Sequence, residues 1–191
     1  MTTPGKPSAR TTTGLRVRRA TAADRDVLER LWLLFRHDMS AVSGELPRPD
    51  GRFRDERLLA ALDDLGHDGA RARWRTHLAT TVAEDPAGGQ VEHPVGFALV
   101  RGLDAPVRVL SAFFVVRAAR RGGVGRDLAG TVLRDLPGPW EIAFQDANIA
   151  AAAFWPRVAT DVTGDAWTVD HRLVPGRPEV PPDAWLSLTV D

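Results

Sequence analysis

Two residue types with reactive side chains are missing from this sequence of 191 residues, which contains no cysteine and no tyrosine. The lack of cysteine excludes disulfides, thiolate metal ligands and a cysteine nucleophile. The lack of tyrosine excludes a phenolic hydroxyl as a proton donor. Both absences restrict the chemistry that an enzymatic mechanism of this chain can use.

Lysine is almost absent as well, because Lys6 is the only one and the other residues counted as Lys or Arg are arginines. The 25 Lys and Arg residues are balanced by 25 Asp and Glu residues, which argues against a general binder of nucleic acids or membranes. Arginine keeps its charge and forks onto phosphate, so local anion sites remain compatible with a net charge of zero.

Long apolar runs are also lacking. No apolar run reaches the roughly 18 residues of a membrane span, and residues 1–14 contain no apolar core of a signal peptide. We therefore expect neither a membrane span nor a signal peptide, and a cytoplasmic location.

The composition that is present predicts a globular fold. Hydrophobic residues make up 43% of the chain and charged residues 26%, as is typical of folded domains. Residues 1–14, rich in Thr, Ser, Pro and Gly, indicate a flexible tail. The length of the remainder favours a single domain over residues 15–191.

The spacing of apolar residues predicts a mixed series of strands and helices. Strands are expected over residues 15–20, 76–85, 94–102, 108–116, 140–144, 167–174 and 185–190. Helices are expected from Thr21 to the turn-rich residues 43–52, and over about 58–65, 124–136 and 148–159. Because helices lie between strands while hairpin-like strand pairs also occur, the fold class is α/β or α+β.

The stretch RAARRGGVGRDLAG, residues 117–130, places glycines between arginines where a helix is predicted to begin. The first N–H groups of a helix lack intrahelical acceptors and carry the positive end of the helix dipole, so they can bind an anion. Gly123 and Gly125 have no Cβ to keep an anion away from the backbone. Arg120, Arg121 and Arg126 add charged donors. A diphosphate fits this arrangement better than a single carboxylate does.

Two common phosphate-binding motifs do not occur in this stretch. No GxxxxGK followed by Ser or Thr is present, and Leu128 stands where a GxGxxG motif needs its third glycine. What remains is R-x-x-G-x-G, from Arg120 to Gly125. Taken alone, these six residues are equally compatible with a surface turn whose arginines are solvated.

The order of segments over about residues 108–159 resembles the GCN5-related N-acetyltransferase (GNAT) family. This order is an apolar strand, R-x-x-G-x-G, an amphipathic helix, a short strand and a helix that opens with Asn. In QDANIAAAAFWPRVA, Asn148, Ala151 and the pair Phe154 and Trp155 add to the likeness. Residues 30–58, and the run PGPWEIAFQDAN, are similar to a bacterial subgroup of predicted acetyltransferases.

The resemblance implies a mostly antiparallel central sheet that is flanked by helices and splayed at an acyl-CoA site. Phe114, Val115 and Val116 would lend backbone groups to the pantetheine arm, and amides near Val115 and Val116 would polarise the thioester carbonyl. Asn148 would bind or orient the pantetheine arm, although Asn is also a preferred helix cap. The residues that would line the pyrophosphate through main-chain amides are Arg120, Arg121, Gly122, Gly123, Val124, Gly125 and Arg126.

The chain departs from the family pattern in two respects. Many members carry a tyrosine at the position of Trp155, where its hydroxyl protonates the departing thiolate. An indole N–H is no usable acid, so we interpret Trp155, beside Phe154 at the cofactor site, as a wall or core residue. Ala41 and Ala112 replace two acids of the subgroup, which makes a fully acidic pocket for polycationic amines less expected.

His37, Glu45 and Ser111 are the candidate catalytic residues, and Asp38 and Ser40 are further candidates for proton transfer. An acceptor amine must lose a proton before it attacks, and His37 has a suitable intrinsic pKa for this. An exposed histidine at a helix end and a solvated loop glutamate are the structural alternatives. The histidines show no HExxH or other ligand spacing, so we expect no metal.

The sequence thus predicts an acyl-CoA-dependent N-acyltransferase that transfers acetyl from acetyl-CoA to a primary amine of a small molecule by direct attack. The alternative is a non-catalytic acyl-CoA-binding sensor of the same fold, since the tyrosine and the acids are missing. We expect no nucleic-acid or membrane partner, and a homodimer is compatible with the family. The identity of the acceptor stays open.

Overall fold

The computed structural model describes residues 13–67, 71–84, 88–174, 176 and 179–191. These residues form one sheet of seven strands in the order β1-β2-β3-β4-β5-β7-β6. Neighbouring strands run antiparallel except β4 and β5, which run parallel. The strands are β1 (Thr13–Arg19), β2 (Trp74–Glu84), β3 (Gln90–Arg101), β4 (Arg108–Val115), β5 (Gly138–Phe144), β6 (Trp167–Arg172) and β7 (Asp183–Val190).

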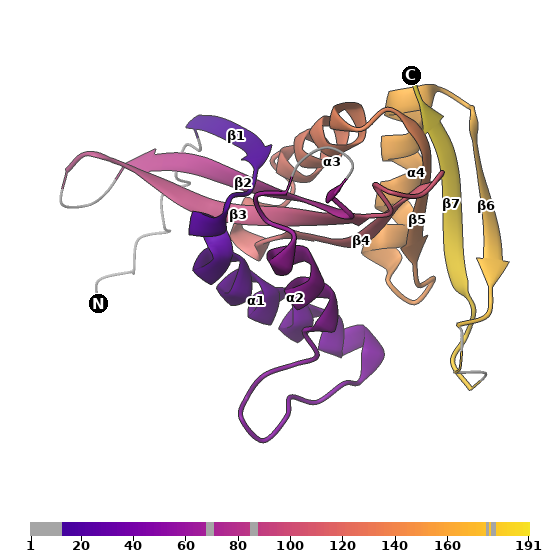
Figure 1. Ribbon diagram of the computed structural model, residues 1–191, viewed down its shortest axis with the longest axis horizontal. Helices are drawn as coiled ribbons and strands as arrows, with labels where there is room; N and C mark the ends of the chain where they lie inside the picture. Colours follow the sequence, from indigo (N-terminus) through magenta and orange to yellow (C-terminus); the bar gives the residue numbers. More distant parts are fainter. Residues whose placement is uncertain (1–12, 68–70, 85–87, 175, 177–178) are drawn as a thin grey trace, which may run out of the picture.

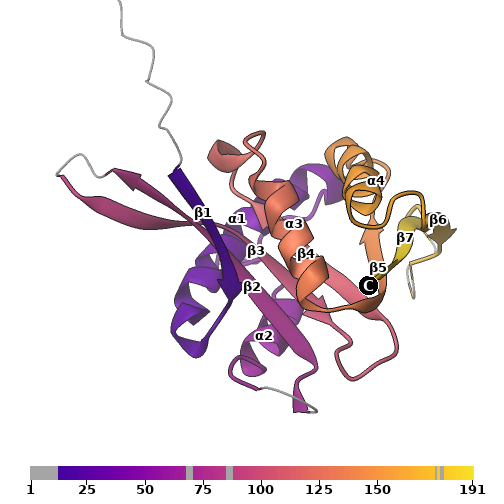
Figure 2. The ribbon, with the colours of Figure 1, turned by 90° about the horizontal axis from the view of Figure 1, so that it is seen from above.

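Helices cover both faces of this sheet (Figures 1 and 2). Helices α1 and α2 lie on one face, below the sheet in Figure 1, and α3 and α4 lie on the other. The α-helices are α1 (Arg25–Ser43), α2 (Glu56–Asp63), α3 (Val124–Asp135) and α4 (Ile149–Thr163). Two short 3-10 turns, η1 (Ala22–Asp24) and η3 (Arg117–Ala119), precede α1 and the glycine stretch.

Side-chain alternation along the central strands divides the core into two clusters. Phe97 of β3 packs in a buried cluster with Leu28 of α1, on the α1/α2 face. Its neighbour Ala98 packs in a second cluster with Leu128 of α3, on the α3/α4 face. Because both faces are covered, residues 95–100 of β3 are buried without interruption.

The entry into α1 is held by the predicted capping pair. The Thr21 N–H donates to Oδ2 of Asp24 at 2.8 Å, and Arg18 of β1 donates to both oxygens of Asp24 at 2.7 Å. The hydrogen bond from Arg18 is the main reason that the pKa of Asp24 falls to about 2. Asp24 therefore ties the start of α1 to β1.

Strands β4 and β5 separate after a short paired section. Their pairing covers Arg108–Leu110 and Trp140–Ile142, although β4 continues to Val115. At the same point β4 carries a bulge: Ala112 pairs with Leu99 of β3 and Leu110 pairs with Val100, so Ser111 is an extra residue. The bulge and the end of pairing together open the sheet, and we call the unpaired part the splay.

The predicted fold class, a mixed and mostly antiparallel sheet flanked by helices and splayed at this point, is confirmed. The first strand begins at Thr13, two residues before its predicted start at Leu15. Residues 1–12 of the predicted tail lie outside the described residues. In the described part of the chain, no helix is long and apolar enough to cross a membrane.

Candidate functional site

The glycine stretch forms a tight turn that leads into α3. Arg121 has a φ of 69° and Gly123 a φ of 86°, both in the left-handed region, and α3 begins at Val124. Among the described residues Arg121 is the one non-glycine residue with a positive φ. Left-handed residues in a turn direct successive N–H groups toward one side, which creates a concavity suited to an anion.

The N–H groups of this turn have no acceptors within the described part of the chain. Ala119 and Arg120 donate to carbonyls of residues 116 and 117, and the next backbone donor with an acceptor is Asp127, which donates to Gly123 O at 3.0 Å. The six N–H groups from Arg121 to Arg126 lie between these bonds. The first four N–H groups of any helix lack intrahelical acceptors, and here these belong to residues 123–126. The turn adds the N–H groups of Arg121 and Gly122.

Two of the three arginines expected to face the phosphates are already paired with carboxylates. Arg120 forms a short ion pair with Asp38 of α1, and its Nε donates to Val115 O at 2.7 Å. Arg126 pairs with Asp161 of α4 at 2.6 Å. Arg121 makes no ion pair within the described residues. The main-chain N–H groups of the turn thus have no partner within the described residues, whereas two of the three guanidinium groups already pair with carboxylates.

Asp38 connects α1 to the residues around the turn. Besides Arg120, it pairs with Arg117 of η3 at 2.9 Å. Burial acts to raise the pKa of Asp38, but hydrogen bonds from the two guanidinium groups outweigh burial and hold the pKa below its usual value. The carboxylate therefore stays charged at neutral pH and neutralises part of the positive charge beside the turn.

The backbone of β4 offers fewer free groups to the splay than expected. The Val116 N–H donates to Val95 O of β3 at 2.8 Å, so the amide of Val116 is not available to a ligand. Alternate residues of a strand direct their backbone groups to opposite sides. The backbone N–H and C=O groups of Val115 therefore face the splay, and those of Phe114 face β3. Of residues 114–116, Val115 is thus the one whose backbone we still expect to contact a pantetheine arm.

Asn148 begins α4 as a cap. Its Oδ1 accepts a hydrogen bond from the N–H of Ala151 at 3.2 Å. Its Nδ2 contacts the sulfur of Met39 of α1 at 3.9 Å, so the amide lies where α1 and α4 approach each other. The capping role is confirmed, and the role toward pantetheine stays a prediction.

Aromatic side chains join α4 to β4 beside the splay. The ring of Trp155 lies 4.9 Å from that of Phe113 and 4.8 Å from that of Phe154, measured between centroids. Trp155 is buried in the core of the α3/α4 face, in agreement with its interpretation as a wall or core residue. A Cβ on Gly125 would lie 3.5 Å from the Phe154 ring, so this glycine also lets α4 approach the start of α3.

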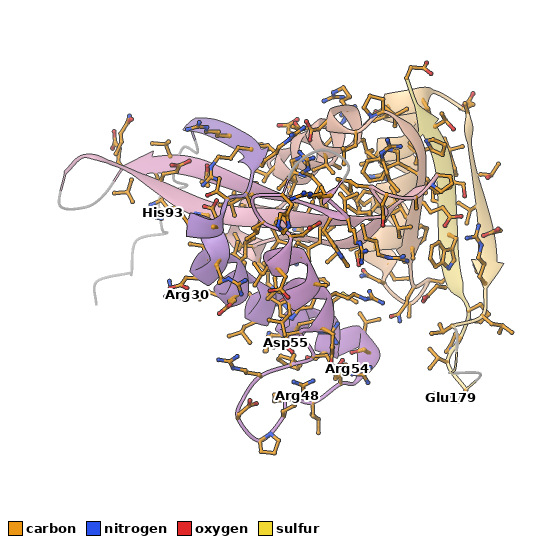
Figure 3. The ribbon with its side chains drawn as sticks, in the orientation of Figure 1. Arg30, Arg48, Arg54, Asp55, His93 and Glu179 are labelled. Atoms are coloured by element: carbon orange, nitrogen blue, oxygen red, sulfur yellow. The ribbon has the colours of Figure 1, made fainter. Side chains whose placement is uncertain are left out.

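Of the candidate bases, His37 and Glu45 do not contact the glycine turn. The side chain of His37 is 76% exposed and makes no hydrogen bond within the described residues. The carboxylate of Glu45 pairs with Arg36 and lies 3.8 Å from Nε of Arg54. Figure 3 shows Arg54 on the loop between α1 and α2. Glu45 thus holds this loop against α1, and a role as base stays a prediction.

Ser111 lies at the point where the sheet opens. Its Oγ is buried and has no hydrogen-bond partner among the described residues. A buried hydroxyl normally has a partner, so one without a partner beside an opening is suited to contact a ligand. Of the three candidate catalytic residues, Ser111 is the one that the fold places in the splay.

Two charged residues that sequence reasoning missed lie on the α1/α2 face near Ser111. Nη1 of Arg57 of α2 lies 3.4 Å from Ser111 O, and the charges of Arg57 and of Asp183 at the start of β7 affect each other's pKa. The two residues cannot share a local sequence motif, because 125 residues lie between them. No signal in the sequence could have brought them together.

A metal site or a surface hollow elsewhere would be an alternative to the glycine turn. The described residues contain no group of three or more His, Asp or Glu side chains that could hold a metal. One hollow lies along β5, β6 and β7 beside Trp167, and another lies between the end of β7 and the ends of α3 and α4 beside Asp161. Neither is lined by any of the predicted site residues. The glycine turn and the splay therefore remain the candidate site.

The sequence matches no protein-family model and no curated protein. The fold, in contrast, is similar to solved structures over nearly its whole length. An acetyltransferase of the GNAT family from Staphylococcus aureus is 14% identical, with a TM-score of 0.56, and the match covers 93% of this chain and 100% of that one. An N-acetyltransferase PaiA from Thermoplasma acidophilum, in complex with coenzyme A, is 9% identical, with a TM-score of 0.56 and coverages of 93% and 99%.

A further similar structure is a candidate streptothricin acetyltransferase from Bacillus anthracis, in complex with acetyl-coenzyme A. It is 12% identical, with a TM-score of 0.56, and the match covers 94% of this chain and 100% of that one. Because almost the entire chain is covered, the similarity includes both halves of the sheet. The chain therefore has the fold of the GCN5-related N-acetyltransferases.

Proposed function

We propose that this protein is an acyl-CoA-dependent N-acyltransferase that transfers acetyl from acetyl-CoA to a primary amine of a small molecule. The observation that carries the proposal is the run of six N–H groups, from Arg121 to Arg126, that have no acceptor among the described residues and lie next to a splayed pair of parallel strands. A pyrophosphate would fill the first feature, and a pantetheine arm the second. Two of the similar structures contain coenzyme A or acetyl-coenzyme A, which supports this assignment.

The residues present fit such a ligand by their chemistry. Free amides at a helix start bind phosphate oxygens without a charged side chain. Gly122 is exposed, and no atom lies within 4 Å of the position that its Cβ would take, so the turn can be approached from solvent. Asp127 opposes binding, because its carboxylate lies 3.9 Å from the position of a Cβ on Gly123. The six amides outnumber this one charge.

When bound, acetyl-CoA supplies the thioester carbonyl that the amine attacks. The Val115 backbone faces the splay and would orient the pantetheine arm and polarise this carbonyl. The Arg120 side chain now holds Val115 O and would have to share it or release it. Phe113, Phe154 and Trp155 would exclude water from one side of the thioester, which strengthens these polar contacts.

The small number of suitable proton donors and acceptors favours a second candidate, an acyl-CoA-binding sensor without catalysis. The chain has no tyrosine, Glu45 is held by arginines, and His37 is exposed. An active enzyme would have to return a proton to the thiolate from the attacking nitrogen or from water. Release of free thiol from acetyl-CoA with a panel of amines distinguishes the two, because a sensor binds acetyl-CoA but releases no thiol above the rate of hydrolysis.

The first experiment is thermal unfolding with and without acetyl-CoA, with NADH and ATP as controls. Acetyl-CoA at about 100 times its Kd stabilises by about 2.7 kcal/mol, which raises the Tm of a domain of this size by about 5–10 °C. We expect this rise with acetyl-CoA and with CoA, and a much smaller one with the controls. An unchanged Tm at saturating acetyl-CoA would contradict the proposal in both of its forms.

A further inference from the structure

Three arginines converge on the α1/α2 face beside the splay. They are Arg36 of α1, Arg57 of α2 and Arg101 at the end of β3. Arg57 contacts Ser111 O, and Arg101 pairs with Val109, two residues before Ser111 in β4. Desolvation and then the charges of Arg101 and Arg36 lower the pKa of Arg57, in keeping with this placement. Asp183 and Glu56 oppose this effect, but neither forms an ion pair with Arg57. The cluster has an excess of positive charge.

The donors of this cluster are not satisfied within the described part of the chain. Arg57 and Arg101 have no carboxylate oxygen within 4 Å, a distance that would make an ion pair, and the contact of Arg57 with Ser111 O is long, at 3.4 Å. Arg36 pairs with Glu45 through Nη2, yet its Nε is buried without an acceptor. Arg57 and Arg101 are exposed, so an anion can reach their guanidinium groups from solvent, and charge-assisted hydrogen bonds to them would hold it.

The carboxylate of Asp183, at the start of β7, acts on this cluster from the other half of the sheet. In β7, Ala184 and Leu186 are buried, and Leu186 belongs to the core of the α3/α4 face, so Asp183 and Trp185 point to the opposite face, where α2 lies. The carboxylate of Asp183 forms no hydrogen bond or ion pair within the described residues. Burial raises its pKa, and Arg57 partly offsets this rise. A carboxylate of this kind can receive an ammonium group or its proton.

We propose that the acceptor is an amino acid: an amine that also carries a carboxylate, which binds Arg57, Arg36 and Arg101 while its ammonium group faces Asp183. This inference rests on the proposed function and adds the class of acceptor to it. Arg57 contacts Ser111 O at the vertex of the splay, and Arg57 acts electrostatically on Asp183, so an amine bound between them would lie beside the place of the thioester. A polycationic amine is disfavoured, because three guanidinium groups would repel it.

The transfer balances with the residues present. The ammonium gives one proton to Asp183, and the nitrogen lone pair forms the C–N bond at the acetyl carbonyl. The C–S bond breaks, and its electron pair goes to sulfur. The nitrogen then loses a second proton to the thiolate, so the products are an N-acetyl amino acid and the free thiol, and Asp183 returns its proton to water. This route needs neither a tyrosine nor a metal.

The test compares matched pairs of acceptors that differ by one carboxylate, such as phenylalanine with phenethylamine and lysine with cadaverine. Release of free thiol from acetyl-CoA is the readout. We expect kcat/KM to be at least about tenfold higher for the amino acid of a pair. Arg57→Gln raises KM for the amino acids by about 10–100-fold, the loss typical of a hydrogen-bonded charge pair. It does not raise KM for the decarboxylated amines, because one repelling charge is removed. Arg101→Gln also raises KM for the amino acids. Asp183→Asn lowers kcat more than it raises KM.

Arg30→Gln is the matched control, since it removes the same charge from the outer side of α1, away from the loop that carries Arg54 (Figure 3). Equal use of both members of each pair by the unaltered protein, or equal loss for both in Arg57→Gln, overturns the proposal. Amino acids that give neither turnover nor a rise in Tm, in a protein that acetyl-CoA stabilises, overturn the acceptor class but leave acetyl-CoA binding intact. No stabilisation by acetyl-CoA overturns the proposed function itself.

Discussion

The two faces of the sheet around the end of β4 present positive charge by different means. On the α3/α4 side the donors are consecutive backbone N–H groups, and the guanidinium groups of Arg120 and Arg126 are paired with carboxylates. On the α1/α2 side the donors are guanidinium groups from three separate elements, and two of them, Arg57 and Arg101, have no carboxylate partner within the described residues. A backbone site requires a short run of residues, whereas a side-chain site requires a completed fold.

This difference also separates two kinds of selectivity. Backbone amides bind any ligand with a suitably placed diphosphate, so the α3/α4 side suits a cosubstrate that many enzymes share. Side chains from distant elements can change one at a time, so the α1/α2 side suits the specific acceptor. Variants that affect one side and not the other test this division.

The largest effect is expected from Gly122→Glu. Gly122 has an open position for a Cβ and no left-handed φ, so the substitution should fold normally while it places a carboxylate in the turn. Like charges brought together cost several kcal/mol, which predicts a loss of acetyl-CoA affinity of about 100-fold or more. Titration calorimetry measures it, with Ala60→Glu on the exposed surface of α2 as the control. Unchanged affinity would remove the turn from the cofactor site.

An ion pair between Arg18 of β1 and Asp24 ties the start of α1 to the sheet, and Asp24→Asn tests its contribution. The pKa of Asp24 is about 2 in the folded protein, below its ordinary value of 3.8, so the charged form stabilises the fold. The variant should lose about 1–2 kcal/mol of unfolding free energy at neutral pH. Because this contribution is complete above about pH 4 and disappears as the pH falls to about 2, the two proteins should converge in acid. Urea unfolding at several pH values checks this, and a pH-independent difference would contradict it.

Ser111→Ala tests whether the vertex of the splay acts on a ligand rather than on the fold. The hydroxyl has no partner, so its removal should change the unfolding free energy by less than about 0.5 kcal/mol. If the hydroxyl contacts the substrate, thiol release should fall by about 3–10-fold, the worth of one hydrogen bond. A fall in stability with unchanged turnover would assign Ser111 to the fold alone.

The smallest effect is expected where the two faces are linked, at Asp38. Asp38→Asn removes the charge that neutralises Arg117 and Arg120, so acetyl-CoA affinity should rise by about twofold to threefold at low salt. The gain should disappear near 1 M salt, because Arg117 and Arg120 are exposed and salt screens their charges. Titrations at two salt concentrations measure it, and a loss of affinity would mean that Asp38 positions Arg120 for the ligand instead.

The sequence alone determined the order of elements and the position of the glycine turn at the start of α3. Each strand and helix has its own periodicity, and R-x-x-G-x-G places glycines at a helix start, so local spacing was sufficient. It also identified Asn148 as a cap and Trp155 as a wall or core residue, since both follow from neighbours along the chain. Local patterns could not show that Val116 donates to Val95, which depends on the pairing of β3 with β4.

Only the tertiary structure decided which side chains meet at the splay. The bulge at Ser111 arises from the register between β3 and β4, and register depends on how a whole strand packs. Arg36, Arg57, Arg101 and Asp183 come from α1, α2, β3 and β7, so their proximity is a property of the sheet order. Coulomb interactions act through space and leave no periodic trace in a sequence, whereas backbone geometry does. For this reason the arginine–glycine motif could be recognised in the sequence, and the proposed acceptor cluster could not.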